Sequence, residues 1–417
     1  MGHRRPTASP TPVRTGPRPL PLHLFSHAST LASSSAALPL LRDGSLSLRP
    51  ALAAQATALK QSLDAAGPDA WSEMAVAVAA EGLARHDAML GGIEAYRRHP
   101  YHRDLPAAPV LWAEGTTRVW DYRQGQGGLP VLVVPSLVNR AYILDLTARR
   151  SLMRDLAGRG LAPFLVDWDA PGDTERGFTL TDYVAGRLSA ALAAVVAATG
   201  RAPAVIGYCM GGNLALALAL LHPDKVAALA LLATPWDFHA GRESHGVLMR
   251  ALADPLGRLI DAAGAVPVDM LNAMFASLDP GLAARKFAAF ARLKRRSARA
   301  RDFVALEDWA NDGVPLAGPV ARECLFGWYG ANSPARGDWQ VGGRAILPEA
   351  ARLPAIALVP ERDRIVPPES ALPLARRLPG CRLMTVRGGH VGMLLSARAK
   401  TDVYAPLAKW LVRSALQ

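Results

Sequence analysis

Short, wholly apolar segments separated by helical stretches constrain the fold of this chain more than any other feature. Four of them follow one another closely: LPVLVVPSL (129–137), LAPFLVDW (161–168), APAVIGYC (202–209) and VAALALLATP (226–235). Two more come late, LPAIALVPERD (353–363) and CRLMTVRGGH (381–390). Strands that are apolar on both faces and alternate with helices form a parallel sheet that helices cover on both sides. The sequence therefore predicts an α/β fold with a mostly parallel sheet.

The predicted strands stop after residue 237 and resume near residue 353. The interval is mostly helical in pattern, and a helical insertion within a parallel sheet is typical of a cap over an active site. Ala- and Leu-rich helical patterns also precede the sheet, over residues 51–98. We expect a disordered N-terminus (1–20), an N-terminal helical extension (21–105), the first part of the core (106–237), a helical cap (238–345) and the second part of the core (346–417).

The chain contains three cysteines, Cys209, Cys324 and Cys381. Their wide spacing provides neither a disulfide framework nor a metal-ligand motif, so we expect no metal and a reducing, cytoplasmic location. We interpret Cys324 and Cys381 as buried packing residues. No apolar run reaches the about 18 residues that span a bilayer, so we expect no transmembrane segment. The stretch PLPLHLF (19–25) is short and broken by Pro and His, which argues against a signal peptide.

The formal net charge is +12. The sequence shows no nucleic-acid-binding motif, so we expect no nucleic-acid partner. Either a generally Arg-rich composition or an anionic substrate such as a CoA ester explains the charge. The basic stretch 285–303 fits a solvated helix face, which we favour, or a site for CoA phosphates. Its apolar residues Phe287, Phe290 and Leu293 are expected to pack the cap rather than to contact a granule.

The sequence Gly207-Tyr208-Cys209-Met210-Gly211 joins a predicted strand to a predicted helix. It has the G-x-S-x-G pattern of a nucleophile elbow, with Cys209 in place of serine. Gly207 and Gly211 suit a tight turn with a strained nucleophile. The N-terminus of the following helix would favour the thiolate of Cys209. The alternative is a small buried cysteine in an ordinary strand–helix turn.

An elbow of this kind needs two backbone donors for the oxyanion. The N–H of Met210 is the first candidate, and the second belongs to the loop after the first core strand. In that loop the N–H of Leu137 or Val138 is our candidate. The side chains of Asn139 and Arg140, which follow, either anchor the loop or contact the substrate.

Two later residues complete a constellation in the chain order of the α/β-hydrolase fold: nucleophile, acid, histidine. Asp363 follows the strand PAIALV (354–359), and His390 follows the strand CRLMTV (381–386). We therefore predict an α/β-hydrolase fold with a Cys209–His390–Asp363 triad. In this triad His390 takes the proton of Cys209, and Asp363 orients the imidazole and stabilises its cation.

At these motifs the sequence resembles the polyhydroxyalkanoate synthases. The similar segments are LVNRAYILDL, VDW, FTLTDYV, GYCMGGNLAL, LHPDKV, ATPWDF, FVALEDWANDGVP, WYGANSPARGDWQVGGR, DRIVPP and GGHVGM. The resemblance implies that Cys209 carries the growing chain, that Asp363 assists and that His390 is the general base. One departure is Arg364, where the family commonly has His directly after the acid.

The resemblance also implies polymerisation of (R)-3-hydroxyacyl-CoA into a polyester, with release of CoA. CoA is then part of the substrate, and no cofactor is expected. The expected partners are the polyester chain or granule surface, with a homodimer or a second synthase subunit left open. A thiol suits this reaction because exchange of one thioester for another keeps the acyl group activated, while a cap keeps water away.

Two other functions compete with polyester synthesis. The first is a cysteine α/β-hydrolase, that is, a thioesterase, an esterase or a polyester depolymerase. The second is a non-catalytic subunit or granule scaffold, which should have lost members of the triad. All three residues are present, which favours an enzyme.

Overall fold

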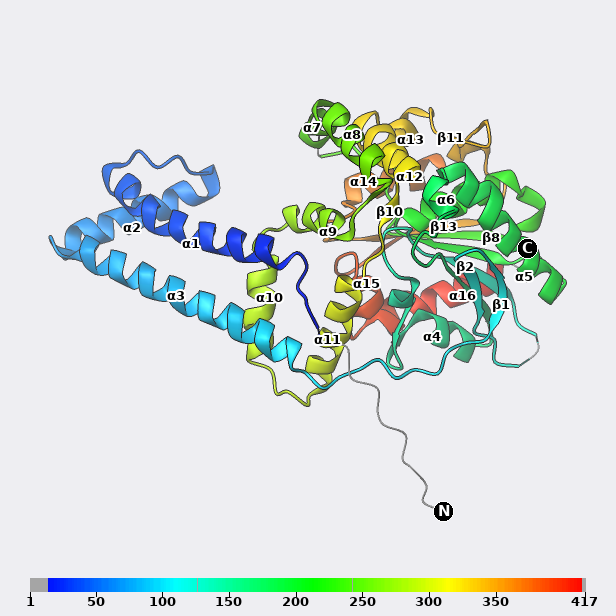
Figure 1. Ribbon diagram of the computed structural model, residues 1–417, viewed down its shortest axis with the longest axis horizontal. Coiled ribbons are helices and arrows are strands. Elements are labelled where there is room, and N and C mark those ends of the chain that lie inside the picture. Colours follow the sequence, from blue (N-terminus) through cyan, green and yellow to red (C-terminus); the bar gives the residue numbers. More distant parts are fainter. Residues whose placement is uncertain (1–13, 126, 242, 415–417) are drawn as a thin grey trace, which may run out of the picture. The chain divides into compact units, whose positions relative to one another are not determined.

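The computed structural model describes residues 14–125, 127–241 and 243–414, which belong to two compact units (Figure 1). Unit 1 contains the chain up to His102 together with Asn272–Asn311. Unit 2 contains Arg103–Leu271 and the chain from Asp312 onward. Residues 1–13 of the predicted N-terminus lie outside the described residues.

Unit 2 is built on an 8-stranded sheet with the order β1-β2-β6-β3-β7-β8-β13-β14. The strands are β1 (Val110–Glu114), β2 (Thr117–Asp121), β3 (Pro130–Val134), β6 (Ala162–Asp167), β7 (Ala204–Tyr208), β8 (Ala228–Leu232), β13 (Ala355–Pro360) and β14 (Arg382–Val386). β1 and β2 pair antiparallel, as do β2 and β6, and the other neighbours are parallel. Every residue of β3, β7, β8 and β13 is buried, as expected for continuous apolar strands between two helical layers. The predicted mostly parallel α/β fold is confirmed.

Helices connect these strands or follow the last of them. They are α4 (Leu152–Gly158), the π-helical η3 (Asp182–Leu188) continued by α5 (Ser189–Thr199), α6 (Met210–Leu221), α14 (Pro368–Arg377), α15 (Gly392–Leu395), and η7 (Lys400–Tyr404) continued by α16 (Ala405–Ser414). Shorter elements are η1 (Ala141–Leu144), β4 (Asp145–Thr147), β5 (Arg150–Ser151), η2 (Glu175–Gly177) and η4 (Pro223–Lys225). In α6 every residue from Met210 to Leu220 is buried, so this helix lies in the centre of the unit.

Among the described residues, one helical stretch, Asp182–Thr199, is long and apolar enough by composition to cross a membrane. Its residues Leu188, Ala191, Leu192 and Val195 are buried in the protein core. It packs against α6, as a covering helix of an α/β sheet does.

Small elements follow β8 and precede β13 in unit 2. They are α7 (Glu243–Ala251), α8 (Ala253–Ala263), β9 (Ala265–Val266), β10 (Leu316–Ala317), α12 (Gly318–Arg322), the π-helical η5 (Glu323–Gly330), α13 (Ser333–Arg336), β11 (Gln340–Val341), β12 (Arg344–Ala345) and η6 (Pro348–Ala350). The helix α9 (Val268–Ser277) carries the chain from unit 2 into unit 1.

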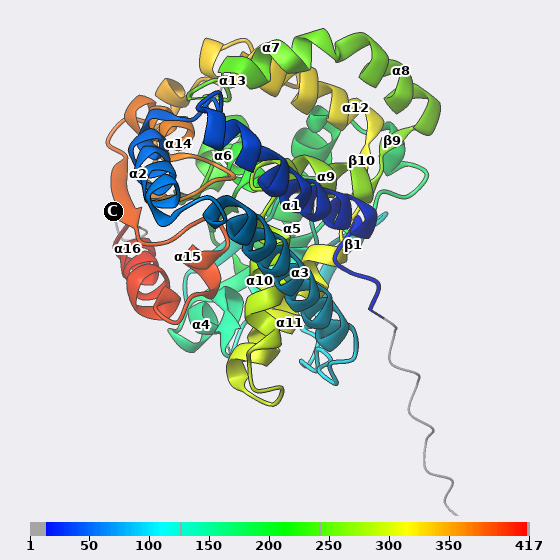
Figure 2. The ribbon, with the colours of Figure 1, turned by 90° about the vertical axis from the view of Figure 1, so that its left-hand side faces the viewer.

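Unit 1 is helical. It contains α1 (Leu20–Asp43), α2 (Pro50–Ala66), α3 (Ala70–Arg97), α10 (Leu282–Ala291) and α11 (Ala298–Asn311). Figure 2 shows α1 and α3 side by side. The structure describes every residue of α1 and α2, and none of these residues is buried.

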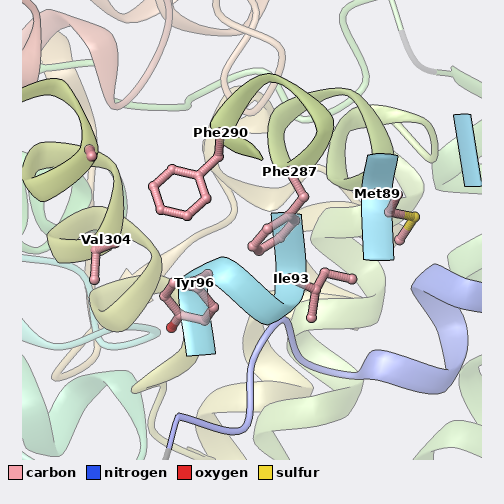
Figure 3. Packing of buried hydrophobic residues seen from close by; sticks show 7 residues of the cluster. Met89, Ile93, Tyr96, Phe287, Phe290 and Val304 are labelled. Atoms are coloured by element: carbon pink, nitrogen blue, oxygen red, sulfur yellow. The ribbon is translucent and has the colours of Figure 1, made fainter. Parts of the chain in front are cut away.

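The core of unit 1 joins segments that are far apart in the sequence (Figure 3). It consists of Met89, Ile93 and Tyr96 of α3, Phe287 and Phe290 of α10, and Ala300 and Val304 of α11. The backbones of α3 and α10 touch, because a Cβ at Gly92 would lie 2.0 Å from the carbonyl oxygen of Phe287. Phe287, Phe290 and the partly buried Leu293 therefore pack in a cluster that includes α3, and not only within the expected cap.

This packing changes the expected domain boundaries. Residues 238–345 were expected to form one cap, but Asn272–Asn311 belongs to the same compact unit as the N-terminal helices. The physical reason is the Phe287–Phe290 cluster, which buries its aromatic rings against α3. The expected cap is thus divided between unit 1 and unit 2.

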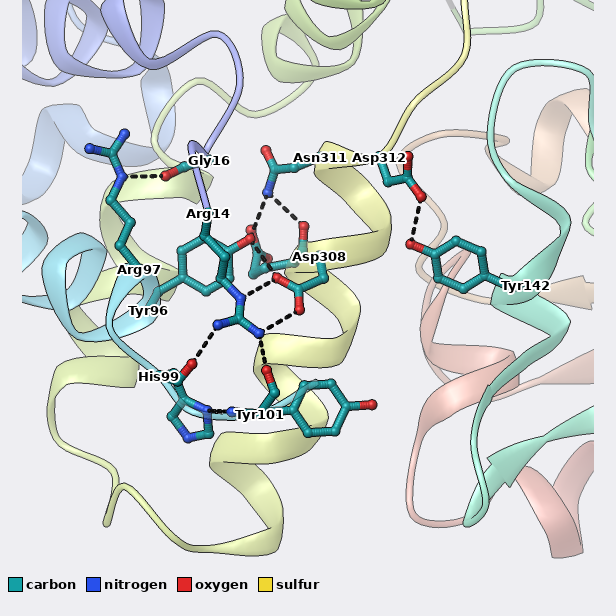
Figure 4. A network of polar contacts seen from close by, with 11 residues as sticks. Arg14, Gly16, Tyr96, Arg97, His99, Tyr101, Tyr142, Asp308, Asn311 and Asp312 are labelled. Atoms are coloured by element: carbon teal, nitrogen blue, oxygen red, sulfur yellow. Dashed lines mark hydrogen bonds and ion pairs between the residues drawn. The ribbon is translucent and has the colours of Figure 1, made fainter. Parts of the chain in front are cut away.

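The segment before α1 is held by Arg14 (Figure 4). Its guanidinium donates to both carboxylate oxygens of Asp308, with Nε at 2.6 Å from Oδ1 and Nη2 at 2.8 Å from Oδ2. It also donates to the carbonyls of His99 and Tyr101. The hydroxyl of Tyr96 donates to the same Asp308 at 2.9 Å. Defined contacts therefore begin at Arg14, earlier than the expected boundary at residue 20.

Candidate active site

The predicted elbow is present between β7 and α6. Cys209 has a φ of 56° and a ψ of −131°, a conformation that costs a non-glycine residue about 1–3 kcal/mol. Two backbone hydrogen bonds hold it: its N–H donates to the carbonyl of Leu232 at 2.9 Å, and its carbonyl accepts from Gly212 at 2.9 Å. The positive φ falls on Cys209 itself, so the strain is located at the proposed nucleophile.

The glycines around Cys209 are required by close approach of neighbouring atoms. A Cβ at Gly207 would lie 2.4 Å from the Cα of Gly212. A Cβ at Gly211 would lie 2.2 Å from the carbonyl oxygen of Val134, at the end of β3. These contacts press the first turn of α6 against β3 and β7, which fixes the direction of the Cys209 side chain.

The structure brings Cys209, His390 and Asp363 together from three strand ends. Nδ1 of His390 lies 2.7 Å from Oδ2 of Asp363, and both side chains are buried. Because a carboxylate only accepts hydrogen bonds, Nδ1 of His390 carries the hydrogen of this contact. Nε2 is then the ring nitrogen that can take the proton of the thiol. Cys209 lies close enough to His390 to raise the pKa of the imidazole. Cys209 itself is partly exposed.

Charges around His390 shift its pKa. Burial alone would lower this pKa, but the negative charge of Cys209 and the hydrogen bonds with Asp363 and Cys209 outweigh burial and raise it to about 10. The site therefore stabilises the protonated imidazole of His390. A histidine that readily takes a proton is the base that a cysteine nucleophile requires.

Sequence reasoning missed Tyr208. This residue ends β7 directly before Cys209, and its side chain is buried beside His390. The only signal was its position inside the elbow motif, which shows neither the direction of its ring nor its partner. Its contacts make it a positioning residue for His390.

The proposed oxyanion donors lie on two segments that touch. Met210 begins α6, where the first N–H groups have no acceptor within the helix. The loop after β3 lies against this turn, as the Gly211 contact with Val134 shows. In that loop, the N–H of Val138 donates to Oγ of Ser136 at 3.1 Å. Of the two candidates in this loop, the N–H of Val138 therefore already has an acceptor within the loop. The other candidate, Leu137, is buried.

The far end of this loop is anchored by charges, which answers the question left open for Arg140 and Asn139. Arg140 forms ion pairs with Asp169 and, at 3.5 Å, with Asp312. The hydroxyl of Tyr142 donates to Asp312 at 3.2 Å (Figure 4). Asn139 forms a backbone bridge with Gly313. These contacts give both residues an anchoring role.

The chain has two other cysteines, Cys324 and Cys381. Cys324 is buried, as predicted, and burial raises its pKa. Cys381 is only partly buried, which differs from the prediction, and burial raises its pKa to about 11. Among residues 14–125, 127–241 and 243–414, no three His, Cys, Asp or Glu side chains are arranged to hold a metal ion.

The basic stretch at 285–303 lies in unit 1. Several of its charges are already paired within that unit. Lys286 lies 2.7 Å from the buried Glu307, and Arg285 lies 2.6 Å from Asp279. Nη2 of Arg295 donates to the carbonyl of Arg98 at 2.7 Å. These partners support the favoured interpretation of a helix face over that of a phosphate site.

Comparison with known proteins identifies the family. The family model of the alpha/beta hydrolase fold matches residues 130–397. The poly(3-hydroxyalkanoate) polymerase subunit PhaC of Synechocystis sp. is 32% identical over 296 residues, which cover 68% of this chain and 77% of the relative. The protein of the same name from Allochromatium vinosum is 29% identical over 72% of this chain and 87% of the relative. This chain therefore belongs to the α/β-hydrolase fold and, within it, to the PhaC family of poly(3-hydroxyalkanoate) polymerases.

Proposed function

We propose that this protein polymerises (R)-3-hydroxyacyl-CoA into polyhydroxyalkanoate and releases CoA, through an acyl thioester on Cys209. The observation that carries the proposal is the strained Cys209 beside a His390–Asp363 pair with a 2.7 Å hydrogen bond. Membership of the PhaC family supplies the substrate class. The relatives are named as polymerase subunits, which supports the expectation of a second synthase subunit.

In the first half-reaction, His390 accepts the proton of the Cys209 thiol, and the thiolate attacks the carbonyl carbon of the acyl-CoA. The N–H of Met210 and one N–H of the loop after β3, from Leu137 or Val138, stabilise the oxyanion. The C–S bond to CoA then breaks, and the imidazolium returns its proton to the departing CoA thiolate. One thioester replaces another, so the acyl group stays activated.

In the second half-reaction, the hydroxyl of another hydroxyacyl unit attacks the carbonyl of the Cys209 thioester. His390 takes the hydroxyl proton, an oxygen ester forms, and Cys209 leaves as a thiolate. Conversion of a thioester into an ester drives elongation. If water attacks in place of the hydroxyl, the same site acts as a thioesterase. The group that accepts the acyl chain therefore distinguishes a polymerase from a thioesterase.

The test uses the full chain with (R)-3-hydroxybutyryl-CoA. Free CoA is followed with a thiol reagent, and the acyl products are analysed by mass spectrometry. Release of CoA with ester-linked oligomers supports the polymerase, while release of CoA with only monomeric hydroxy acid makes the protein a thioesterase.

Two variants test the role of the thiol. Cys209→Ala should abolish CoA release without loss of the fold. Cys209→Ser keeps the shape of the side chain but replaces the thiol by a hydroxyl, so it tests the thiol alone. A folded Cys209→Ala protein that still turned over substrate would refute the acyl-cysteine mechanism.

A further inference from the structure

One side of the Cys209 thiol is apolar. Cys209, Ile365 and Leu372 are all partly buried, and all three pack against the same buried cluster of Val359, Val366 and Ala371. Val359 belongs to β13, Ile365 and Val366 follow Asp363, and Ala371 and Leu372 belong to α14. The proposed nucleophile therefore packs against the same apolar cluster as two large branched side chains, Ile365 and Leu372.

The segment that carries Ile365 is held by the carboxylate of Asp363. Oδ1 of Asp363 accepts from the N–H of Ile365 at 2.8 Å and from the N–H of Val366 at 2.9 Å. Oδ2 of the same side chain binds His390. The acid therefore fixes the base with one oxygen and the apolar segment with the other.

The first turn of α14 is held by backbone hydrogen bonds from the segment after β8. The carbonyl of Ser370 accepts from the N–H groups of Trp236 and Asp237, both at 3.0 Å. Ser370 is buried and directly precedes Ala371 and Leu372. Both Ile365 and Leu372 consequently belong to backbone segments pinned by buried hydrogen bonds, and a wall fixed in this way discriminates by size.

Attack on a thioester requires its carbonyl carbon to come within about 3–3.5 Å of the sulfur. The substituent on the third carbon of a hydroxyacyl group begins three bonds from that carbonyl carbon, so it reaches the apolar surroundings that Cys209 shares with Ile365 and Leu372. We propose that Ile365 and Leu372 form the wall that contacts this substituent and restricts the enzyme to short ones, such as methyl. This inference rests on the proposed function, because it assigns a specificity to the same site.

The test compares kcat/KM for (R)-3-hydroxybutyryl-CoA and (R)-3-hydroxyhexanoyl-CoA in the wild type, Ile365→Ala and Leu372→Ala. Each extra methylene in an apolar pocket discriminates by about 10- to 200-fold. We expect the wild type to prefer the shorter substrate, and each variant to shift the ratio by about 10-fold or more toward the longer one. The matched control is Val412→Ala on α16, an apolar side chain that is 45% exposed, and it should leave the ratio unchanged.

An unchanged ratio in both folded alanine variants would overturn the wall, as would a wild type that prefers the longer substrate. If an alanine variant does not fold, Ile365→Val and Leu372→Val make smaller cavities, and a shift in the same direction supports the proposal. If neither valine variant shifts the ratio, that result counts against the proposal.

A second readout separates this inference from the proposed function. Incubation with p-nitrophenyl butyrate or hexanoate transfers the acyl group to the Cys209 thiolate and releases p-nitrophenolate, and mass spectrometry measures the acylated protein. If the wild type releases no CoA from hydroxyacyl-CoA, the proposed function fails. The ratio of butyryl to hexanoyl transfer still tests the wall, which requires that ratio to fall in Ile365→Ala and Leu372→Ala.

Discussion

The phenol ring of Tyr208 lies against the imidazole of His390, with 5.1 Å between ring centroids and 32° between their planes. The hydroxyl of Tyr208 also donates to the backbone carbonyl of His390 at 3.2 Å. One buried side chain therefore holds both the ring and the backbone of the proposed base. The adjacent residue in the sequence is Cys209, so the elbow positions its own base as well as its nucleophile.

Replacement of Tyr208 separates these two contacts. Tyr208→Phe keeps the ring and loses one buried hydrogen bond, which should cost about 0.5–1.5 kcal/mol of stability and little activity. Tyr208→Leu also loses the ring contact, so the pH profile of Cys209 alkylation by iodoacetamide should change in this variant and stay unchanged in Tyr208→Phe. If both variants gave the wild-type profile while folded, Tyr208 would have only a structural role.

The raised pKa of His390 predicts a pH dependence of stability. The pKa is about 10 in the folded protein against an ordinary 6.5, so the folded state binds this proton more tightly. The resulting stabilisation is fully present below about pH 6.5 and is lost as pH rises through about 10.

Thermal melts of the wild type and Cys209→Ala from pH 6 to pH 10.5 measure this effect. Cys209→Ala removes the negative charge that contributes most to raising the pKa. The alkaline loss of stability in this variant should begin at lower pH than in the wild type. Identical profiles would show that the thiolate and imidazolium are not paired.

The contact between Gly212 and Thr234 predicts a destabilising substitution. A Cβ at residue 212 would lie 1.9 Å from Oγ1 and 2.7 Å from Cβ of Thr234, which is buried. Gly212→Ala should therefore cost about 1–3 kcal/mol through overpacking, measured by denaturant unfolding. Adding Thr234→Gly should recover part of this loss, because it removes the clashing atoms.

The matched control for this clash is Gly186→Ala in η3, where an added Cβ meets nothing within 4 Å. Helix propensity favours Ala over Gly by about 1 kcal/mol, so this variant should be neutral or more stable. Equal losses at residues 186 and 212 would rule out the clash as the cause.

The ion pair between Arg14 and Asp308 predicts local stability in unit 1. Arg14→Ala leaves Asp308 and two carbonyls without a charged donor, so we expect a loss of about 1–3 kcal/mol. Hydrogen–deuterium exchange at the amides of α11 should accelerate accordingly. Arg85→Ala breaks the exposed Arg85–Glu81 pair and should change exchange little. Equal acceleration in both variants would contradict a special role for Arg14.

The parallel sheet and the elbow were predictable because their causes are local in the sequence. Continuous apolar runs identify strands buried on both faces, and glycines around Cys209 identify a crowded turn. Asp363 and His390 were found because each directly follows a strand, and the structure joins them through a 2.7 Å hydrogen bond.

The remaining features depend on partners distant in the sequence. The pattern around Phe287 predicts burial, but nothing near it indicates that α3 supplies the partner or that Asn272–Asn311 shares a unit with the N-terminal helices. Arg14 stands in a Pro-rich stretch that suggests disorder, whereas its partner Asp308 is almost three hundred positions later. Tyr208 was missed for the same reason, since His390 is 182 residues away.

The two oxygens of Asp363 have a consequence for how a family of such enzymes diversifies. Any change of this acid disturbs the base and the apolar segment together, because one oxygen binds His390 and the other binds the N–H groups of Ile365 and Val366. Those hydrogen bonds use backbone groups, so the side chain at residue 365 is free to vary under selection while the bonds persist. A substitution at residue 365 can therefore alter the apolar surroundings of Cys209 while both hydrogen bonds of Asp363 to the backbone persist.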